Sequence, residues 1–197
     1  MRKLIVSANM TLDGFMAGLH GELDWHFPFW TDEMAAYASR QLRAVDTILV
    51  GRLTYQKMAA YWPFAPHNDY SEMMNGYEKI VFSTSLKKTG WQHSRVLAGN
   101  IGEEVERLKQ QAGRDMIIYG SVSIVQALGA MGLVDEYQVF LHPVAIGRGI
   151  PLFAGPGGPQ CLALLKTRAL CSGVLLLHYG PGGAAGFPYG HPSTGSG

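Results

Sequence analysis

The chain has 197 residues, 47% of them hydrophobic and 16% charged, values typical of one folded domain rather than a disordered or fibrous protein. Sixteen Lys and Arg against fifteen Asp and Glu leave a net charge of +1, and no basic run indicates a nucleic-acid partner. No apolar stretch approaches the roughly 20 residues that span a bilayer, and no secretory signal is apparent at the N-terminus. We expect a cytoplasmic protein with a small-molecule partner.

The first predicted elements are a strand, a helix, a second strand and a short helix. Residues 2–8 form an apolar run typical of a buried strand. After a loop, Thr31 can cap a helix whose apolar face runs from Met34 to Val45. The β-rich run 47–50 predicts the second strand, which stops at a glycine, and Thr54 can cap the short helix that follows.

The middle of the chain begins with a predicted loop, 61–70, that is rich in proline and aromatic residues. A third strand is predicted at 79–82. Asn100 and Glu103 then have the spacing of a capping box, and apolar residues continue at helical spacing until Gly113. This is the best-defined helix that the sequence predicts.

The strand-glycine-helix pattern repeats once more before strands follow alone. Residues 116–119 predict a buried strand that ends at Gly120, and a helix follows that closes near Gly132. The remaining predicted strands are 136–144 and a hairpin of 162–170 with 174–179. The order predicts a three-layer α/β domain over 1–179, with a mostly parallel sheet and a C-terminal antiparallel hairpin.

The C-terminal region contains a predicted tail and both cysteines of the chain. Residues 180–197 contain seven glycines and three prolines, too few apolar groups for a core, and are predicted to form a tail. Cys161 and Cys171 flank one predicted strand, so at about 3.3 Å per residue they lie roughly 30 Å apart, beyond disulfide reach. Both are predicted to be free, buried thiols.

Three polar segments follow predicted strands: Gly51-Arg52-Leu53-Thr54, Ser83-Thr84-Ser85 and Gly120-Ser121-Val122-Ser123. In open α/β sheets, ligands bind at the carboxyl ends of the strands, where helix N-termini offer N–H groups to anions. Arg52 and the Thr54 hydroxyl suit a pyrophosphate with an adjacent phosphate. Hydroxyls without an acid after the third strand favour the 2′-phosphate of NADP over the ribose of NAD. Alternatively, such turns occur for purely geometric reasons.

Several common motifs are absent from the sequence. There is no GxGxxG fingerprint, GxxxxGK[ST] loop or GxSxG elbow, which disfavours an ordinary Rossmann dehydrogenase, a P-loop NTPase and an α/β-hydrolase. The histidines show no HxxxH or HExxH spacing and the cysteines no CxxC, so we predict no metal. His142, in a predicted strand before Pro143, is interpreted as a core or dimer-surface residue rather than a catalyst.

Acids and aromatic residues alternate around the first loop and helix. They are Asp13, Glu22, Asp24 and Asp32, with Trp25, Phe27, Phe29 and Trp30 among them. An aromatic-walled cleft with a carboxylate suits a flat heterocycle, because it offers stacking surfaces and an acceptor for ring N–H groups. The alternative is that the aromatic residues close the core and the acids cap helices.

Ordered motifs along residues 1 to 179 resemble the dihydrofolate reductase-like superfamily. They are Thr11-Leu12-Asp13-Gly14 with Phe15-Met16-Ala17, Val50 to Tyr55, Val81 to Ser85, Ile118 to Ser121, Leu133 to Glu136, and Pro143 to Gly149. More specifically, they look like the branch that includes the C-terminal reductase domain of the bifunctional riboflavin-biosynthesis deaminase/reductase. The deaminase zinc motif of that bifunctional protein is absent.

The resemblance implies an NADPH site. It places Gly51, Arg52 and Thr54 at the phosphates, Ser83 to Ser85 at the adenosine 2′-phosphate side, Gly120 to Ile124 at the pyrophosphate and nicotinamide side, and Met16 and Ala17 against the nicotinamide. Dihydrofolate reductases have a cis peptide within a glycine pair at this point. In this chain Ser121 stands in place of the second glycine, so the bond between Gly120 and Ser121 can be either cis or trans.

The resemblance also implies the catalytic side. In the riboflavin branch the aspartate of the Ser/Thr-Leu-Asp-Gly motif lies near the substrate, which makes Asp13 the first candidate. Dihydrofolate reductases have an acid at the start of the first helix, where Asp32 stands, although its spacing from Trp25, a candidate substrate contact, differs from theirs. These residues would serve hydride transfer from NADPH to a C=N or C=O carbon of a small heterocycle or sugar-like substrate.

Two further functions stay open, and one assembly is expected. The first is reduction of 5-amino-6-(5-phosphoribosylamino)uracil in riboflavin biosynthesis. The second is a nucleotide-binding or regulatory protein without turnover. A homodimer is implied by the resemblance, and apolar strands such as 174–177 suit a partner surface.

Overall fold

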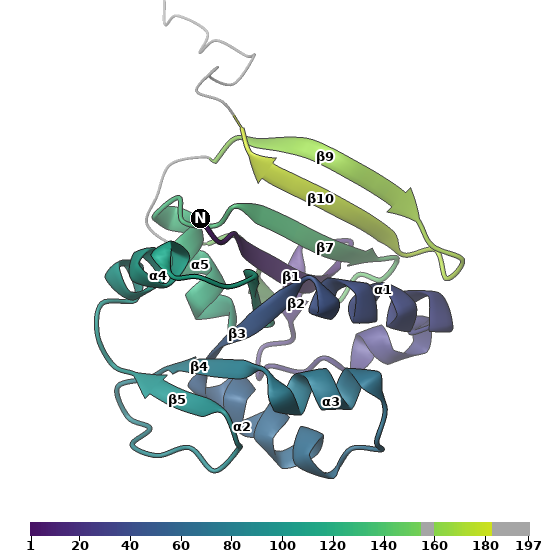
Figure 1. Ribbon diagram of the computed structural model, residues 1–197. Coiled ribbons are helices and arrows are strands. Elements are labelled where there is room, and N and C mark those ends of the chain that lie inside the picture. Colours follow the sequence, from purple (N-terminus) through teal and green to yellow (C-terminus); the bar gives the residue numbers. More distant parts are fainter. Residues whose placement is uncertain (155–159, 183–197) are drawn as a thin grey trace, which may run out of the picture.

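The computed structural model describes residues 1–154 and 160–182. Its centre is an eight-stranded sheet in the order β5-β4-β3-β6-β1-β7-β10-β9 (Figure 1). The strands are β1 (Leu4–Thr11), β3 (Val45–Gly51), β4 (Glu78–Phe82), β5 (Ser94–Leu97), β6 (Asp115–Ile118), β7 (Glu136–His142), β9 (Leu162–Ala169) and β10 (Leu175–Pro181). The neighbouring strands β5, β4, β3, β6, β1 and β7 run parallel to one another. Strand β10 is antiparallel to both β7 and β9.

Helices cover both faces of this sheet. They are α1 (Asp32–Arg43), α2 (Arg52–Tyr61), α3 (Asp69–Gly76), α4 (Ile101–Gln110) and α5 (Val122–Ala130), with two short 3-10 segments, η1 (Asp24–Phe29) and η2 (Trp62–Phe64). Leu4 and Val6 of β1 face a core shared with α4 and α5, whereas Ile5 faces a second core shared with α1, α2 and α3. Because side chains of a strand alternate between faces, one apolar strand supplies both cores.

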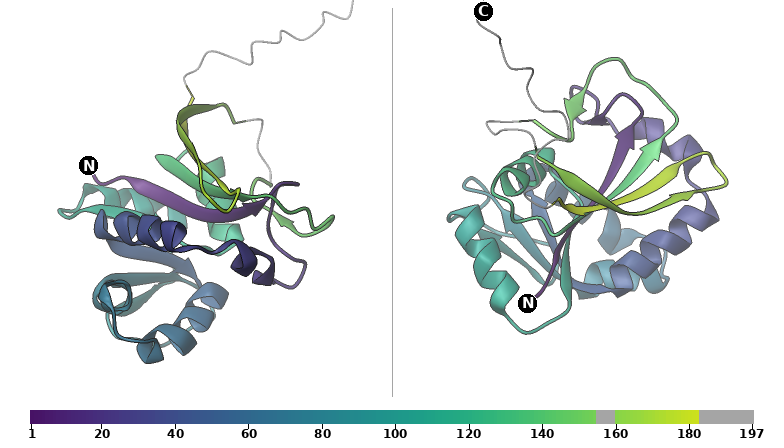
Figure 2. Two further views of the ribbon diagram at one scale, coloured as in Figure 1. Left: turned by 90° about the vertical axis from the view of Figure 1, so that its right-hand side faces the viewer. Right: turned by 90° about the horizontal axis from the view of Figure 1, so that it is seen from above.

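The hairpin of β9 and β10 extends the sheet past the helices at one end (Figure 2). A second, two-stranded sheet pairs β2 (Phe15–Ala17) with β8 (Ile150–Pro151) in antiparallel orientation. The prediction of a three-layer α/β fold with a mostly parallel sheet and a terminal antiparallel hairpin is confirmed. In the described part of the chain, no helix has the length and apolarity that crossing a membrane requires.

Several predicted boundaries are wrong. Helix α2 begins at Arg52 with Gly51 as its N-cap, so Thr54 lies in the first turn and does not cap the helix. Asn100 caps α4 by accepting the Gly102 N–H, but Glu103 accepts from the Asn100 side chain and not from its backbone, so the predicted capping box does not form.

One helix and one strand of the large sheet were not predicted, nor were the short elements β2, β8, η1 and η2, and the thiols are more accessible than expected. The predicted loop and the residues after it contain helix α3, and strand β5 forms the sheet edge beyond β4. Both cysteines are free, as predicted, but Cys171 is exposed and Cys161 is only half-buried, because β9 is the edge strand. Strand β10 continues through Pro181 into the predicted tail, and residues 183–197 of that tail lie outside the described residues.

Candidate functional site

The segments that the sequence singled out meet at the carboxyl edge of the parallel strands. Gly51 N–H donates to the Gly120 carbonyl at 3.3 Å. A Cβ on Gly51 would lie 2.1 Å from Ser121 Oγ, and one on Gly120 would lie 3.2 Å from Thr54 Oγ1. These contacts join the starts of α2 and α5, so a side chain at Gly51 would require the Ser121 side chain to move. The bond between Gly120 and Ser121 is cis.

The N-termini of α2 and α5 differ from those of the other helices. Thr31, Asn68 and Asn100 cap α1, α3 and α4 with their side chains, and each of these three helices has acids in its first turn. The N-caps Gly51 of α2 and Ser121 of α5 make no side-chain cap hydrogen bond, and neither helix has an acid in its first turn. Apart from the Ile124 N–H, which donates to the Ser121 carbonyl, the N–H groups of both first turns and the positive ends of both dipoles are therefore open to an anion.

Arg52 adds a positive charge at the first residue of α2. Its guanidinium donates to Gln56 Oε1 at 3.2 Å, and within the described residues no carboxylate forms an ion pair with it. A cation at a helix N-terminus is unfavourable with respect to the helix dipole. An anion bound between Arg52 and the helix end would remove that cost.

The start of α5 offers fewer free groups than the sequence suggested. Val122 and Ser123 open the first turn, and the Ser123 hydroxyl lies 3.3 Å from that of Ser121. Ile124 is buried in the core, and its N–H donates to the Ser121 carbonyl. Ile124 thus contributes a packed side chain rather than a hydrogen-bond donor.

A pocket of about 290 Å³ lies at the carboxyl end of β4. Its lining comes from the ends of β4 and β5 and the start of α4: Phe82, Ser83, Thr84, Leu97, Ala98, Gly99 and Ile101. Ser83 Oγ accepts the N–H groups of Ser85 and Leu86 at 3.2 and 2.9 Å, which holds the turn in shape. Ser83 and Thr84 thus line a pocket, while Ser85 belongs to the turn beside it.

Met16 and Ala17 are buried in strand β2. A Cβ on Gly149 would lie 2.3 Å from the Ala17 carbonyl oxygen, so the loop before β8 approaches β2 as closely as backbone allows. Strand β2 therefore pairs with β8 rather than with a strand of the large sheet, while Met16 packs into the core beneath that sheet.

The two candidate acids have different surroundings. Asp13 accepts hydrogen bonds from Thr11 Oγ1 at 2.6 Å and from the N–H groups of Ile146 and Gly147 at 3.0 and 2.7 Å. The Thr11 bond, followed by those backbone donors, lowers the pKa of Asp13. Asp32 is exposed in the first turn of α1, and no hydrogen bond joins its carboxylate to another described residue. Asp13 secures a loop, whereas Asp32 is available to solvent.

The predicted aromatic wall divides into two parts. Trp25 and Phe29 pack their edges against His142, with ring centroids 5.3 and 5.7 Å from it. Phe27 and Trp30 instead point to solvent, with 66% and 43% of their surface exposed. The interpretation of His142 as a core residue is correct for its burial, but its Nδ1 has no partner among the described residues. Within the same residues, no group of three or more potential ligands is gathered for a metal.

The chain is similar to curated proteins over most of its length. It is 33% identical over 182 residues to the uncharacterized protein YyaP of Bacillus subtilis, covering 90% of this chain and 94% of that protein. It is 26% identical over 159 residues to the riboflavin biosynthesis protein RibD of Corynebacterium ammoniagenes, covering 74% of this chain and 44% of that longer protein.

Solved structures show the same fold. A putative riboflavin biosynthesis protein from Shewanella sp. PV-4 superposes with a TM-score of 0.75 at 19% identity, covering 91% of this chain and 99% of that one. A dihydrofolate reductase from Enterococcus faecalis, complexed with NADP(H) and RAB-propyl, superposes with a TM-score of 0.60 at 12% identity, covering 91% of this chain and 96% of that one. The family model of the RibD C-terminal domain matches residues 2–176. The chain therefore belongs to the RibD C-terminal domain family and has the dihydrofolate reductase-like fold.

Proposed function

We propose that this protein is an NADPH-dependent reductase acting on a small heterocyclic or carbonyl/imine substrate. The observation that carries the proposal is the meeting of two uncapped, acid-free helix N-termini at Gly51 and Ser121. Such a pair suits a pyrophosphate, because two helix dipoles and their free N–H groups converge on one place. Membership in the RibD C-terminal domain family supports a reductase.

The residues present fit NADPH along the carboxyl edge. Gly51, Arg52 and Thr54 would hold phosphates on one side, and Gly120 to Ser123 on the other. The pocket of Ser83 and Thr84 would take the adenosine 2′-phosphate, with Ser85 shaping its turn. Met16, Ala17 and Ile124 would contact the nicotinamide side. When bound, NADPH supplies the hydride.

The protein itself would orient the substrate and manage one proton. Asp13 already accepts three hydrogen bonds, which favour its charged form and fit it for positioning β2. Asp32 is exposed and suits exchange of a proton with water, so we place the compensating proton at its carboxylate or at a water that it holds. Trp25 would form part of the substrate wall.

The test compares binding of NADPH and NADH by calorimetry. We expect tighter binding of NADPH, and we expect Arg52→Ala to reduce that preference about tenfold, a value typical of one charge-assisted phosphate contact of about 1.4 kcal/mol. Arg107→Ala on α4 removes an exposed arginine elsewhere and should leave the preference unchanged. Equal affinity of the wild-type protein for both nucleotides would contradict the NADPH assignment.

A second candidate is reduction of 5-amino-6-(5-phosphoribosylamino)uracil, which the family match favours. A related fold occurs in a Thermotoga maritima protein whose name includes that reductase activity. Growth without riboflavin of a reductase-deficient strain that expresses this chain would support it. Tight NADPH binding with no oxidation across pterins, pyrimidines and carbonyls would instead favour a nucleotide-binding or regulatory protein.

We also propose that residues 1–179 act as one domain and that two copies form a dimer through the terminal hairpin. Leu164 and Leu165 on the edge strand β9 are 53% and 59% exposed, an apolar edge that proteins usually cover. Sedimentation of wild type and of Leu165→Lys tests this. A monomeric wild-type protein would contradict the dimer.

A further inference from the structure

The connection between β4 and β5, residues 83–93, crosses the sheet without a helix. Because β4 and β5 are parallel neighbours (Figure 1), this β4–β5 connection leads from the carboxyl edge back to the amino edge. It leaves the carboxyl edge at Ser83 and Thr84, which line the candidate pocket. Further along, Trp91 is the only residue of the connection that is buried, with 4% of its surface exposed. Trp91 therefore anchors a segment that otherwise is exposed or half-buried.

Four elements hold Trp91 in place. Its backbone N–H donates to the Tyr55 hydroxyl of α2 at 3.1 Å, and its indole N–H donates to Asn75 Oδ1 of α3 at 2.7 Å. The Asn75 amide in turn donates to the Trp62 carbonyl of η2 at 3.0 Å. The indole ring also covers the Lys79 ammonium of β4, with Nζ 4.3 Å from the ring centroid, a cation–π contact. Both N–H groups of this buried residue thus have an acceptor.

The Lys79 ammonium makes the base of this anchor rigid. Lys79 is completely buried, and its Nζ donates to the carbonyls of Met74 and Asn75 at 3.1 and 2.7 Å. These carbonyls lie in the last turn of α3, where a cation is favourable with respect to the helix dipole. Trp91 therefore rests on α3 and β4, and the hydrogen bond to Tyr55 is what joins α2 to this base.

Tyr55 gives the anchor a link to the candidate phosphate site. It lies in the first turn of α2, the helix that begins with Arg52, and it is 4% exposed. In the described part of the chain, side chains of α2 make two hydrogen bonds outside the helix. Lys57 donates to the Gly21 carbonyl at 3.1 Å, and the Tyr55 hydroxyl accepts from the β4–β5 connection. The Tyr55 bond thus fixes the start of α2 relative to the connection that lines the pocket.

We propose that Tyr55 is a positioning residue that sets the spacing between the start of α2 and the pocket of Ser83 and Thr84. A nucleotide that carries both a pyrophosphate and a 2′-phosphate can then engage both places at once. Such a ligand gains from a fixed spacing because its second contact is intramolecular, whereas a ligand that fills one place gains nothing. The Tyr55 hydroxyl acts through Trp91 and not by contact with the nucleotide. The inference rests on the proposed function, because it concerns how the same site selects NADPH.

The test uses Tyr55→Phe, which removes the hydroxyl and keeps the ring. Calorimetry measures the binding of NADPH and NADH, and an NMR titration measures that of adenosine 2′-monophosphate. We expect NADPH binding to weaken about tenfold, which corresponds to about 1.4 kcal/mol. The affinities for NADH and adenosine 2′-monophosphate, which each fill one place, should change less than about twofold. The Trp91 amide loses its acceptor, so its hydrogen exchange, followed by NMR, should become about tenfold faster.

The matched control is Tyr137→Phe on β7. It removes the hydroxyl of an equally buried tyrosine, 3% exposed, for which no hydrogen bond to another described residue is formed by the hydroxyl. Binding of all three ligands should stay within about twofold of wild type. In the wild-type chain, NADPH but not NADH should slow exchange of the Trp91 amide, because coupling between two sites is reciprocal. This last reading does not depend on the folding of a variant.

The outcomes separate this inference from the proposed function. If the wild-type chain prefers NADPH and Tyr55→Phe binds it equally well, the positioning role is overturned and the reductase proposal stands. An equal loss of affinity for all three ligands assigns Tyr55 to the stability of the site as a whole and also overturns the role. The same holds if exchange of the Trp91 amide is unchanged in Tyr55→Phe, or responds alike to both dinucleotides. A wild-type chain that does not bind NADPH contradicts the proposed function itself, and the positioning role fails with it.

Discussion

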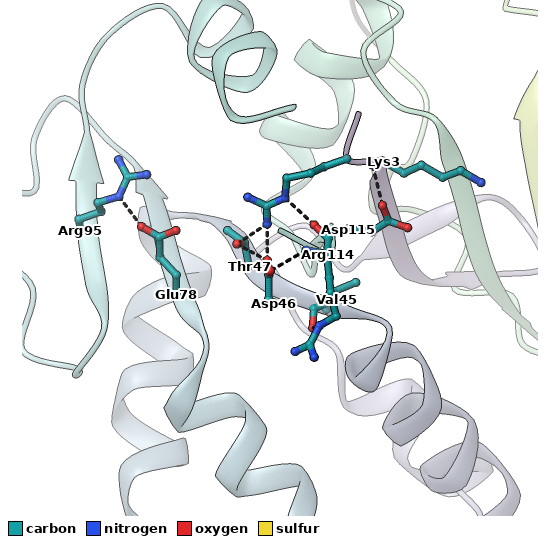
Figure 3. Close-up of polar contacts among 9 residues, drawn as sticks. Lys3, Val45, Asp46, Thr47, Glu78, Arg95, Arg114 and Asp115 are labelled. Atoms are coloured by element: carbon teal, nitrogen blue, oxygen red, sulfur yellow. Dashed lines mark hydrogen bonds and ion pairs between the residues drawn. The ribbon is translucent and has the colours of Figure 1, made fainter. Parts of the chain in front are cut away.

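Polar groups are paired at the amino edge of the parallel sheet, whereas several are left without partners at its carboxyl edge. At the amino edge, Arg2 is 6% exposed and donates to the Asp46 carboxylate and to Thr47 Oγ1. Asp46 also accepts the Arg114 N–H at 2.7 Å, and Asp115 accepts the Lys3 N–H at 2.8 Å (Figure 3). These bonds join the starts of β1, β3 and β6.

A second amino-edge pair works in the same way. Lys109 Nζ lies 2.6 Å from Asp135 Oδ2, and that oxygen also accepts the Leu4 N–H at 2.7 Å. Buried charges at this edge are thus paired and hydrogen-bonded, as folding requires.

The carboxyl edge instead leaves polar groups open. Gly51 and Ser121 provide no side-chain cap for their helices, and Trp25 and His142 each bury a nitrogen without a partner. Polar groups at the amino edge are thus satisfied within the fold, whereas the carboxyl edge keeps groups that the proposed cofactor would complete.

The largest effect is expected from removing the partner of the buried arginine at the amino edge. Asp46→Ala leaves the buried Arg2 unpaired, so we expect the free energy of unfolding to fall by about 3 kcal/mol, measured by urea denaturation. The affinity for NADPH at the other edge should not change. Asp69→Ala removes an exposed ion pair with Arg43 and should cost less than about 0.5 kcal/mol. A loss of NADPH affinity in Asp46→Ala would show that the two edges are not independent.

A smaller effect is expected from adding a methyl group where the starts of α2 and α5 meet at the carboxyl edge. The new methyl group of Gly51→Ala would meet Ser121 Oγ at 2.1 Å and Ile124 Cδ1 at 3.1 Å. We expect NADPH binding to weaken about 30-fold, equivalent to about 2 kcal/mol, with unfolding changed by less than about 1 kcal/mol because the serine side chain can rotate. Gly76→Ala, where no atom lies within 4 Å of the new Cβ, is the matched control. Unchanged calorimetric affinity in Gly51→Ala would place the phosphates elsewhere.

The smallest effect concerns the pH dependence of stability. Burial lowers the pKa of His142 from its usual 6.5 to about 4 in the fold, so the unfolded chain binds more protons between those values. Stability is fully present above pH 6.5 and is lost as the pH falls towards 4. From pH 7 to 5.5, wild type should lose about 1 kcal/mol more than His142→Phe, measured by denaturation at each pH. His67→Gln, at an exposed histidine, should follow wild type; equal slopes for His142→Phe and wild type would contradict the burial argument.

Local patterns in the sequence were sufficient for most elements but not for α3 and β5. Helix α3 is capped by Asn68 with Ser71 as the reciprocal partner, whereas the usual capping-box pattern has Glu or Gln at that position. Strand β5 has four half-buried residues at the sheet edge, so it shows neither a buried run nor a clear alternation. Strand β5 forms by pairing with β4, and α3 packs Met74 into the core that it shares with α1 and α2, so both elements depend on tertiary contacts.

The candidate cofactor site could be predicted in outline, and the surroundings of the acids could not. Gly51, Arg52, Thr54, Gly120 and Ser121 follow strands that run in parallel, so their meeting follows from the order of elements. Asp13 is different, because two of its three donors, the N–H groups of Ile146 and Gly147, are more than 130 residues away. No local pattern indicates that such a carboxylate is already engaged.

The sequence by itself determined the layered α/β fold and the edge at which the candidate cofactor segments gather, because strand and helix periodicity and the glycines after strands are local properties. Only the tertiary structure decided which polar groups are satisfied. Helices α2 and α5 have open N-termini that converge, and the Nδ1 atom of His142 has no hydrogen-bond partner among the residues described here. The reason is physical: hydrogen-bond satisfaction depends on distance in space, and residues that complete or expose a group come from strands and loops far apart in the chain.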